Sequence, residues 1–358
     1  MKIFIWGTGY RANQILDECN VFNAYDVIGF IDNNPNKNGS KFRGIKVYQP
    51  DILENTEPDK IVILTDSFEE IKQQIIDTFP MMQGIIENKS FFYRDIIIER
   101  YKDIHDSEIK EVMAYIQKND IQIFNYDFVD KYKKMDIEVQ YNPNCKMFYV
   151  YHQNKKLYFA KYLDTEEKVR EYYLGLLIEQ DNRSPHKYLS SDFNVNEGDI
   201  VVDVGVAEGN FSLEVIEKAA KIYMIEAEDM WVEALNETFK EYQDKVITIK
   251  KYITSINKGK YATLDDLINE PVNFLKMDIE GNEWDGLLGA EKLFKRSKKM
   301  KSAICSYHSN SDEILIKDLL GKYDVKCSTT SGYMWWPFLN NQDYVSTRLC
   351  RGIVRGVK

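Results

Sequence analysis

Short apolar runs alternate with amphipathic stretches along most of the chain, and the clearest example lies between residues 198 and 228. Residues 200–204 (IVVDV) form a nearly all-apolar run, which is typical of a strand buried on both faces. Two glycines follow it, a helix is predicted over about 211–220, and a second strand over 222–225 ends at Glu226. This order predicts a βαβ unit whose turn lets a ligand approach the backbone closely.

The same alternation continues toward the C-terminus and predicts a mostly parallel sheet. The predicted elements are a helix over 231–242, a strand over 246–250, a short helix over 263–268 capped by Thr263, a buried strand over 273–277, a strand beginning near 303 with a helix after it, and closing strands near the end. Because ligands bind beyond the carboxyl ends of parallel strands, Asp203, Glu226 and Asp278 are expected at one edge.

Residues 1–98 show an alternation of their own and predict a smaller α/β domain. Strands are expected over 2–6, 26–31, 45–48 and 60–65, with a glycine turn and a helix after the first. Gly7 and Gly9 supply half of a dinucleotide fingerprint, because Ala12 stands at the third glycine position. We therefore expect a Rossmann-like front domain, and these glycines alone do not assign it a dinucleotide.

Residues 99–190 differ from both flanking regions and predict a bridge. Helices are expected over 106–118 and over 166–179, the second capped by Thr165, and a hairpin over 146–163. The predicted domains are therefore 1–98, the helical and hairpin bridge 99–190, and a second α/β domain over 191–358.

Composition narrows the class of partner. The chain has 358 residues and a net charge of −10, which argues against a nucleic acid as the main partner. Its five cysteines show no metal-binding spacing, and no apolar run is long enough to span a membrane. The first residues predict a short strand, and we expect no signal peptide. We expect a cytoplasmic protein with a small-molecule or saccharide substrate; a homo-oligomer is left open.

The spacing around the first turn separates two kinds of ligand. A dinucleotide turn usually reads G-x-G-x-x-G, whereas this one reads D-x-G-x-x-x-G over Asp203, Gly205 and Gly209. A carboxylate there would repel a pyrophosphate, but it can accept a hydrogen bond from the ammonium group of S-adenosylmethionine. Glu226 lies near the interval of roughly 20 residues at which an acid reaches a ribose diol. The alternative is a tight turn in some other α/β domain.

Candidate chemistry also follows the later strands. Asp278 and Glu280 lie where the strand over 273–277 gives way to a helix, and Tyr307 and His308 lie just past the next strand. His186 precedes the βαβ unit in a loop. These five side chains are expected on the acceptor side of the site.

A family resemblance rests on several motifs in order: VVDVGVAEGNFS, YMIEAE, ATLDDL, KMDIEGNEWDGLLGA and SYHSNSDEI. Over residues 184–345 the chain resembles FkbM-type S-adenosylmethionine-dependent methyltransferases, which implies a Rossmann-like class I fold. The resemblance assigns cofactor contacts to Asp203, Gly205, Gly209 and Glu226, and we expect Asp278 to join them. It implies methylation of hydroxyl groups of sugars or polyketide-derived products. Ala227 departs from the family, since many members have proline there.

The expected reaction is a one-step O-methylation in which the enzyme aligns the acceptor oxygen behind the methyl carbon. His308 is the predicted general base, and Asp278 is either the alternative base or the group that orients His308. His186, Glu280 and Tyr307 are expected to contact the substrate. Asp278, Glu280 and His308 could offer ligands to Mg²⁺ or Mn²⁺, but their spacing is not diagnostic and no metal site is predicted.

The front domain resembles the small domain of PglD-type sugar acyltransferases through IWGTGYRANQIL, GFIDNNPNKNG and FRGIKVYQPDIL. That resemblance implies sugar metabolism and a domain of the type that binds nucleotides or nucleotide-sugars. A working nucleotide site and a docking domain with an emptied pocket are both left open. Two rival functions remain: an NAD(P)-dependent sugar oxidoreductase or epimerase using the front glycine turn, and a non-catalytic sugar-binding or assembly protein.

Overall fold

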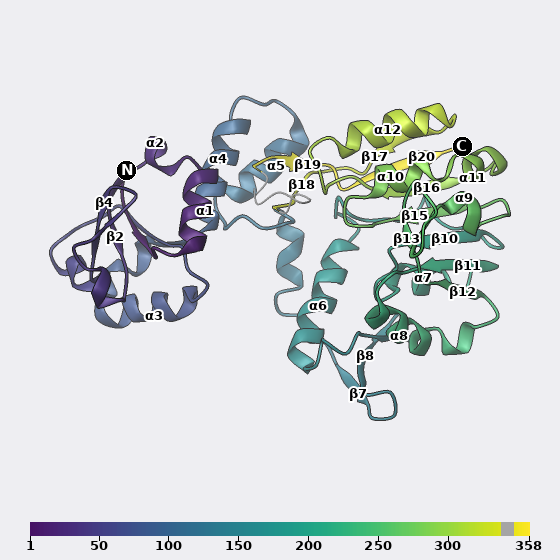
Figure 1. Ribbon diagram of the computed structural model, residues 1–358, viewed down its shortest axis with the longest axis horizontal. Helices are drawn as coiled ribbons and strands as arrows, with labels where there is room; N and C mark the ends of the chain where they lie inside the picture. The colour runs from purple at the N-terminus through teal and green to yellow at the C-terminus, as the bar shows by residue number, and fades with distance from the viewer. Residues whose placement is uncertain (338–346) are drawn as a thin grey trace. The chain divides into compact units, whose positions relative to one another are not determined.

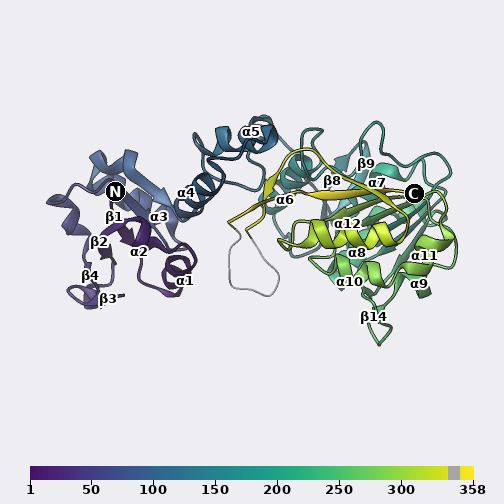
Figure 2. The same ribbon diagram turned by 90° about the horizontal axis from the view of Figure 1, so that it is seen from above.

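The computed structural model describes residues 1–337 and 347–358, which form two compact units (Figures 1 and 2). The front unit comprises Met1–Gln122 and also includes Thr347, whose hydroxyl oxygen accepts a hydrogen bond from Arg100 at 3.1 Å. The rear unit comprises residues 123–337 and Arg348–Lys358. The segment 99–190, predicted as a bridge, is divided between the two units.

The front unit is built on a six-stranded sheet in the order β3-β4-β2-β1-β5-β6. All neighbours are parallel except β3 and β4. The strands are β1 (Lys2–Trp6), β2 (Asp26–Ile31), β3 (Lys41–Phe42), β4 (Ile45–Tyr48), β5 (Lys60–Ile63) and β6 (Ile86–Asn88). The four strands predicted here are confirmed, and the parallel core matches the expected Rossmann-like arrangement.

Helices and apolar side chains complete the front unit. Phe4 and Trp6 of β1 are buried and belong to a cluster with Ile71 and Ile75 of α3. The side chain of Asp106 caps α5 by accepting hydrogen bonds from two backbone amides. The helices are α1 (Tyr10–Glu18), α2 (Val21–Ala24), α3 (Phe68–Thr78), α4 (Ser90–Tyr101) and α5 (Ser107–Ile116), with short 3₁₀ turns η1 (Pro35–Lys37), η2 (Pro50–Glu54) and η3 (Pro80–Ile85).

The rear unit contains a seven-stranded sheet in the order β12-β11-β10-β15-β16-β20-β17. The first five strands are parallel, and β20 runs antiparallel to both of its neighbours. Since β11 pairs with β10 on one side and β15 on the other, the strand order reverses at β10, and ligands of open α/β sheets bind beyond the strand ends at such a position. The strands are β10 (Ile200–Val204), β11 (Lys221–Ile225), β12 (Val246–Ile249), β15 (Phe274–Met277), β16 (Lys301–Cys305), β17 (Lys326–Thr329) and β20 (Ile353–Val357).

Helices surround this sheet, and the unit also contains small sheets of two or three short strands. The helices are α6 (Glu166–Glu179), α7 (Asn210–Val215), α8 (Asp229–Thr238), α9 (Leu264–Leu267), α10 (Glu283–Leu288), α11 (Glu291–Arg296) and α12 (Asp312–Lys322), with 3₁₀ turns η4 (Asp127–Lys131) and η5 (Lys240–Tyr242). The short strands are β7 (Gln140–Asn142), β8 (Met147–His152), β9 (Lys155–Tyr158), β13 (Tyr252–Ile253), β14 (Tyr261–Ala262), β18 (Met334–Trp335) and β19 (Leu349–Cys350). Across the described residues, every helix is too short or too polar to cross a membrane.

The packing explains why the strands read as continuous apolar runs. Val202 and Met277 face a core shared with Leu287 of α10 and Ile316 of α12. The ring of Phe274, from the same strand as Met277, stacks instead near Phe211 and Phe193. Both faces of the central strands are therefore covered, as a parallel sheet requires.

Local signals placed several helix ends correctly. Thr165 caps α6 by accepting from the amide of Lys168, and Thr263 caps α9 by accepting from the amide of Asp266. The helix after the glycine turn, however, ends at Val215 rather than near residue 220. The chain turns there because it must reach the start of β11, and the amide of Ala220 bonds to the carbonyl of Asp199.

Candidate active site

The turn after β10 requires glycine at positions 205 and 209 for steric reasons. Gly205 has a positive φ of 73°, and a Cβ atom there would lie 1.7 Å from the carbonyl oxygen of Asp278. Gly209 has a φ of 90°, and its Cβ would lie 2.8 Å from side-chain atoms of Leu235 and Phe239. A side chain at either position would therefore disrupt the turn. The backbone of the turn also packs directly against the segment that carries Asp278.

Asp203 is completely buried at the end of β10 and is held by side chains of the protein itself. Its Oδ2 accepts a hydrogen bond from Ser212 at 2.7 Å, and its Oδ1 lies 3.1 Å from the ammonium nitrogen of Lys276. Lys276 also donates to the carbonyl of Gly205 at 2.5 Å. Burial lowers the pKa of Lys276, but Asp203 and Asp278 outweigh it and raise the pKa above its ordinary value, so the lysine is charged. The predicted contact of Asp203 with a cofactor stays a prediction.

Sequence reasoning missed Lys276, although a signal for it exists. A lysine in the apolar strand segment NFLKMD is unusual, because lysine is almost never fully buried without a partner. Its register opposite Asp203 in the parallel pair β10 and β15 supplies that partner. The pair fixes the two strands whose ends carry the turn and Asp278.

Glu226 follows β11 and supports the turn from the neighbouring strand. Its two carboxylate oxygens accept hydrogen bonds from the backbone amides of Ala207 and Glu228, each at 2.9 Å. Ala207 has a positive φ of 48°, so this bond holds an uncommon backbone conformation. Glu226 thus lies at the predicted edge of the sheet, although its contact with a ribose stays a prediction.

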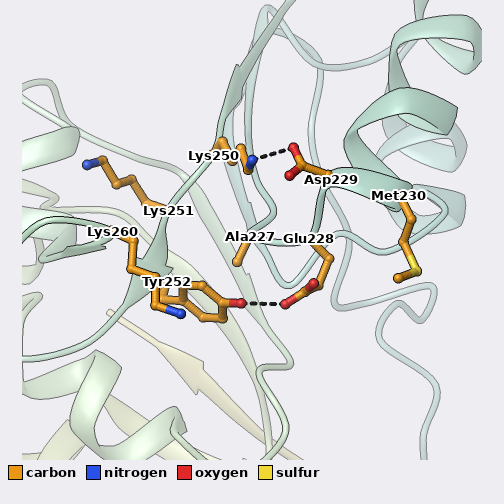
Figure 3. A pocket seen from close by; sticks show the side chains of 8 residues that line it. All are labelled: Ala227, Glu228, Asp229, Met230, Lys250, Lys251, Tyr252 and Lys260. Atoms are coloured by element: carbon orange, nitrogen blue, oxygen red, sulfur yellow. Dashed lines mark hydrogen bonds and ion pairs between the residues drawn. The ribbon is translucent and has the colours of Figure 1, made fainter.

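A pocket of about 450 Å³ begins one residue after Glu226, at the carboxyl ends of β11 and β12 (Figure 3). Inside it, the hydroxyl of Tyr252 donates to Glu228, and Lys250 pairs with Asp229. Its volume lies in the range of small-molecule sites, and an adenosine group fits that range. None of these lining side chains was predicted. The pocket is lined by Ala227, Glu228, Asp229, Met230, Lys250, Lys251, Tyr252 and Lys260.

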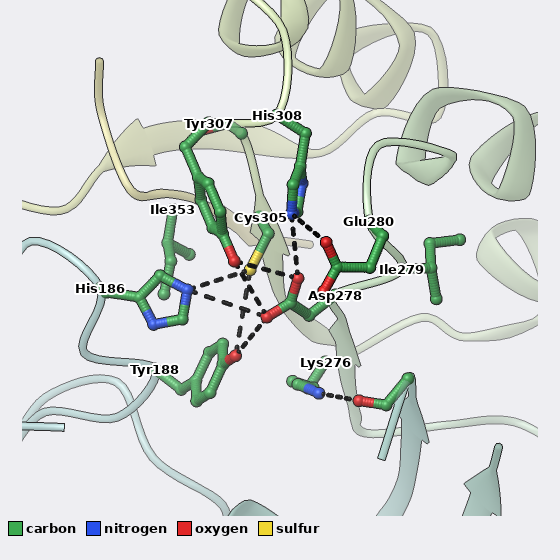
Figure 4. Close-up of polar contacts among 12 residues, drawn as sticks. His186, Tyr188, Lys276, Asp278, Ile279, Glu280, Cys305, Tyr307, His308 and Ile353 are labelled. Atoms are coloured by element: carbon green, nitrogen blue, oxygen red, sulfur yellow. Dashed lines mark hydrogen bonds and ion pairs between the residues drawn. The ribbon is translucent and has the colours of Figure 1, made fainter. Parts of the chain in front are cut away.

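The carboxylate of Asp278 is the centre of a second cluster, at the ends of β15 and β16 (Figure 4). Tyr188 donates to Oδ2 at 2.9 Å, and the hydroxyl of Tyr307 lies 3.3 Å from both oxygens. His186 Nε2 lies 3.8 Å from Oδ2 and 3.6 Å from the sulfur of Cys305. Sequence reasoning anticipated Asp278, His186 and Tyr307 here, but missed Tyr188 and Cys305, which no local motif marks.

His308 lies among three carboxylates. Its Nε2 is 3.7 Å from Asp278 Oδ1 and 3.5 Å from Glu280 Oε2, while its Nδ1 is 3.3 Å from Glu283 Oε1. The imidazole is only 1% exposed, and neither ring nitrogen makes a hydrogen bond of good geometry. The structure therefore brings all five predicted acceptor-side residues together: His186, Asp278, Glu280, Tyr307 and His308.

The two histidines of the cluster differ in their ionisation. Burial lowers the pKa of His186 to about 4, so that ring is neutral at pH 7. Burial also works to lower the pKa of His308, but Glu283, Asp278 and Glu280 outweigh it and raise the pKa to about 9. Burial raises the pKa of Asp278, yet Lys276 and the two histidines bring it below its usual value. His308 therefore holds a proton at neutral pH.

Two groups of side chains in the described ranges have ligand atoms close enough to hold a metal ion. One is Asp278, Glu283 and His308, and the other is His186, Asp278 and Cys305; within each group the ligand atoms lie within 4.8 Å of one another. The expectation of no metal stays a prediction at this point.

Comparison with protein families gives the class of the rear unit. The model of the FkbM methyltransferase domain matches residues 111–345. The chain belongs to the FkbM methyltransferase family, and the predicted Rossmann-like methyltransferase fold is confirmed. This membership makes it an S-adenosylmethionine-dependent methyltransferase of the FkbM type. The match begins well before residue 184, where the resemblance read from the sequence was expected to start.

Several solved structures are similar to the chain at low identity. A methyltransferase FkbM from Methylobacillus flagellatus is 15% identical, covering 100% of this chain and 90% of that chain, with a TM-score of 0.44. A SAM-dependent methyltransferase from Aquifex aeolicus is 15% identical, covering 53% and 96%, with a TM-score of 0.34. Magnesium protoporphyrin IX methyltransferase from Synechocystis, solved with bound S-adenosylhomocysteine, is 13% identical, covering 47% and 77%, with a TM-score of 0.32.

The front unit matches a different family model. Residues 1–86 match the N-terminal domain of C2185-like proteins. The resemblance to PglD-type acyltransferases is not among these findings and stays a prediction. Among curated proteins, no sequence matches the chain.

Proposed function

We propose that the protein transfers a methyl group from S-adenosylmethionine to a hydroxyl of a sugar, either nucleotide-linked or a precursor of a surface polysaccharide. The observation that carries this proposal is the direct packing of the Gly205 turn against the carbonyl of Asp278. It joins the two expected halves of the site, one for the cofactor and one for the acceptor, at one edge of the sheet.

The cofactor half has features that fit S-adenosylmethionine. The pocket next to Glu226 has the volume for an adenosine group, and Glu226 and Glu228 supply carboxylates at its border for ribose hydroxyls. When bound, the cofactor supplies a methyl group made electrophilic by its sulfonium. The backbone of the turn from Gly205 to Gly209 would position that end of the molecule toward Asp278.

The acceptor half would orient a hydroxyl for in-line displacement. The acceptor oxygen forms the new bond to the methyl carbon while the carbon–sulfur bond breaks, and the hydroxyl proton leaves. Asp278 is held by two tyrosine hydroxyls and can accept a hydrogen bond from the acceptor. Asp278 and His308 are the two groups proposed to act on that proton, His308 only after it has lost its own.

A labelling experiment tests the proposal. The full-length protein is incubated with S-adenosylmethionine carrying an isotopically labelled methyl group and a panel of nucleotide-sugars and free sugars, and the products are identified by mass spectrometry. We expect label on a sugar oxygen, with Asp278→Asn reducing turnover at least 100-fold and the exposed Glu291→Gln leaving it unchanged. Transfer to a nitrogen or carbon atom, or full activity of Asp278→Asn, would contradict the proposal.

The cytoplasm is kept as the proposed location. All five cysteines are free thiols, as is usual in a reducing compartment. The observations favour neither rival function. An oxidoreductase would depend on the front turn, where the carboxylate of Asp32 is already paired with Lys37.

A further inference from the structure

The imidazole of His308 makes no good hydrogen bond, although it is almost fully buried among carboxylates. Carboxylate oxygens lie 3.3 to 3.7 Å from its ring nitrogens, and a buried nitrogen without a well-placed hydrogen-bond partner keeps its desolvation penalty. Nε2 is directed between Asp278 and Glu280, as Figure 4 shows. We propose that Asp278, Glu280 and His308 bind a divalent cation of the Mg²⁺ or Mn²⁺ type.

The distances suit ligands better than hydrogen bonds. Adjacent ligand atoms around an octahedral ion lie about 1.4 bond lengths apart, which gives roughly 2.9 Å for Mg²⁺ and up to about 3.7 Å for Ca²⁺. The imidazole Nε2 is 3.5 Å from Glu280 Oε2 and 3.7 Å from Asp278 Oδ1. An inward movement of somewhat under about 1 Å by each carboxylate would bring it to the spacing from Nε2 that two ligands of one Mg²⁺ ion have.

Glu283 has the place of an outer partner that orients the histidine. Its Oε1 lies 3.3 Å from Nδ1 of His308 and accepts amide hydrogen bonds from Ile279 at 2.8 Å and Gly281 at 3.2 Å. A carboxylate held in this way fixes the ring so that Nε2 faces the ion, as is common for metal-bound histidines.

The other two proposed ligands, Asp278 and Glu280, are placed differently from each other. Asp278 is positioned by Tyr188, which leaves its Oδ1 directed at His308. Glu280 is 85% exposed at its side chain and has a positive φ of 54°, so it closes the site from the solvent side. An ion there would keep open positions for water or for a hydroxyl group.

What the cation would do rests on the proposed function. An ion at the acceptor side would hold one or two neighbouring sugar hydroxyls and lower the pKa of the one to be methylated. The acceptor class then narrows to sugars with vicinal hydroxyls. In this arrangement His308 is a ligand, which replaces the base role predicted for it.

Metal binding is measured first without cofactor or acceptor. The full-length protein is treated with chelator, dialysed, and titrated with Mn²⁺ while free Mn²⁺ is followed by electron paramagnetic resonance; Mg²⁺ is then added as a competitor. We expect one saturable site, weakened at least tenfold in Glu280→Gln and in Asp278→Asn, and unchanged in Glu291→Gln. Because Glu280 is exposed, Glu280→Gln should remain folded, which circular dichroism checks.

Each result has a distinct meaning. The absence of saturable Mn²⁺ binding, or equal binding by the parent and by Glu280→Gln, would overturn the metal site. Turnover that survives chelation would also overturn it, while leaving the proposed function intact. If the ion binds as expected but no sugar is methylated, the site stands and the proposed function fails.

Discussion

The two glycine turns of this protein follow one plan but treat their acidic residue differently. In the front unit, Asp32 ends β2 and is held by Lys37 at 2.7 Å and by the hydroxyl of Thr8. In the rear unit, Glu226 ends β11 and receives the backbone amides of Ala207 and Glu228. Lys37, from the loop that follows Asp32, forms an ion pair with the carboxylate of Asp32. The carboxylate of Glu226 instead lies next to the pocket that begins at Ala227. A strand-turn-helix pattern alone therefore does not identify the working site.

The glycines show the same contrast. A Cβ atom at Gly9 of the front turn would meet nothing within 4 Å, whereas one at Gly205 would collide with backbone. The rear turn is therefore packed against the segment that carries Asp278. In the front turn, a side chain in place of Gly9 would meet no steric conflict.

The largest effect is expected from Gly205→Ala. The new Cβ would lie 1.7 Å from a backbone oxygen at a positive φ, so the turn must move. We expect a loss of at least about 4 kcal/mol in unfolding free energy, or no folded protein, measured by urea denaturation. Gly198→Ala is the control, because its φ of 83° is similar but nothing lies within 4 Å; it should cost only about 1 kcal/mol. Equal losses in both variants would show that packing against Asp278 is unimportant.

The next effect concerns the buried pair of the rear unit. Lys276→Met would leave Asp203 buried without its cation, which should cost about 3 to 5 kcal/mol. Adding Asp203→Asn should recover much of this loss, because no uncompensated charge remains. Lys37→Met in the front unit removes a partly exposed pair and should cost no more than about 1 kcal/mol. A double variant as unstable as Lys276→Met would contradict the pairing.

A smaller effect depends on pH. Burial raises the pKa of Glu208 to about 7, although Tyr172 and Lys276 oppose this; Tyr162 and Glu179 also interact with it. The folded state therefore binds the proton more tightly than the unfolded state, and stability falls as pH rises from about 5 to 8. Glu208→Gln should match the parent near pH 5 and melt several degrees higher at pH 8, a gain of at most about 3 kcal/mol. A constant difference in melting temperature across this range would exclude the effect.

The smallest effect should come from the front turn. Asp32→Asn removes a carboxylate already occupied by Lys37, so we expect less than about 1 kcal/mol in stability and no change in methyl transfer. Unfolding curves and the labelling assay measure both. Loss of activity in this variant would give the front unit a part in the reaction that its geometry does not suggest.

The elements of the fold were largely visible in the sequence because apolar periodicity and caps are local. Most strands of the two sheets, though not β3 and β6, and helix α6 with its Thr165 cap were predicted from such signals. The candidate site was only partly visible. Strand ends placed Asp278 and His308 together, since the carboxyl ends of parallel strands share an edge.

The missed residues share a physical reason. Tyr188 bonds to Asp278 across 90 positions, and Tyr172 bonds to Glu208 across 36, so no local pattern links them. Their contacts arise only when segments preceding β10 pack over the sheet edge. Lys276 is the exception, because a charge inside a buried strand is a local signal that a partner exists.

Calorimetric titration with S-adenosylmethionine tests most directly whether the rear turn is the cofactor site. The parent should bind one equivalent, Glu226→Gln should bind at least tenfold more weakly, and Asp32→Asn should bind as the parent does. Failure of the folded parent to bind, or equal weakening by Asp32→Asn, would contradict the assignment of the cofactor to the rear turn.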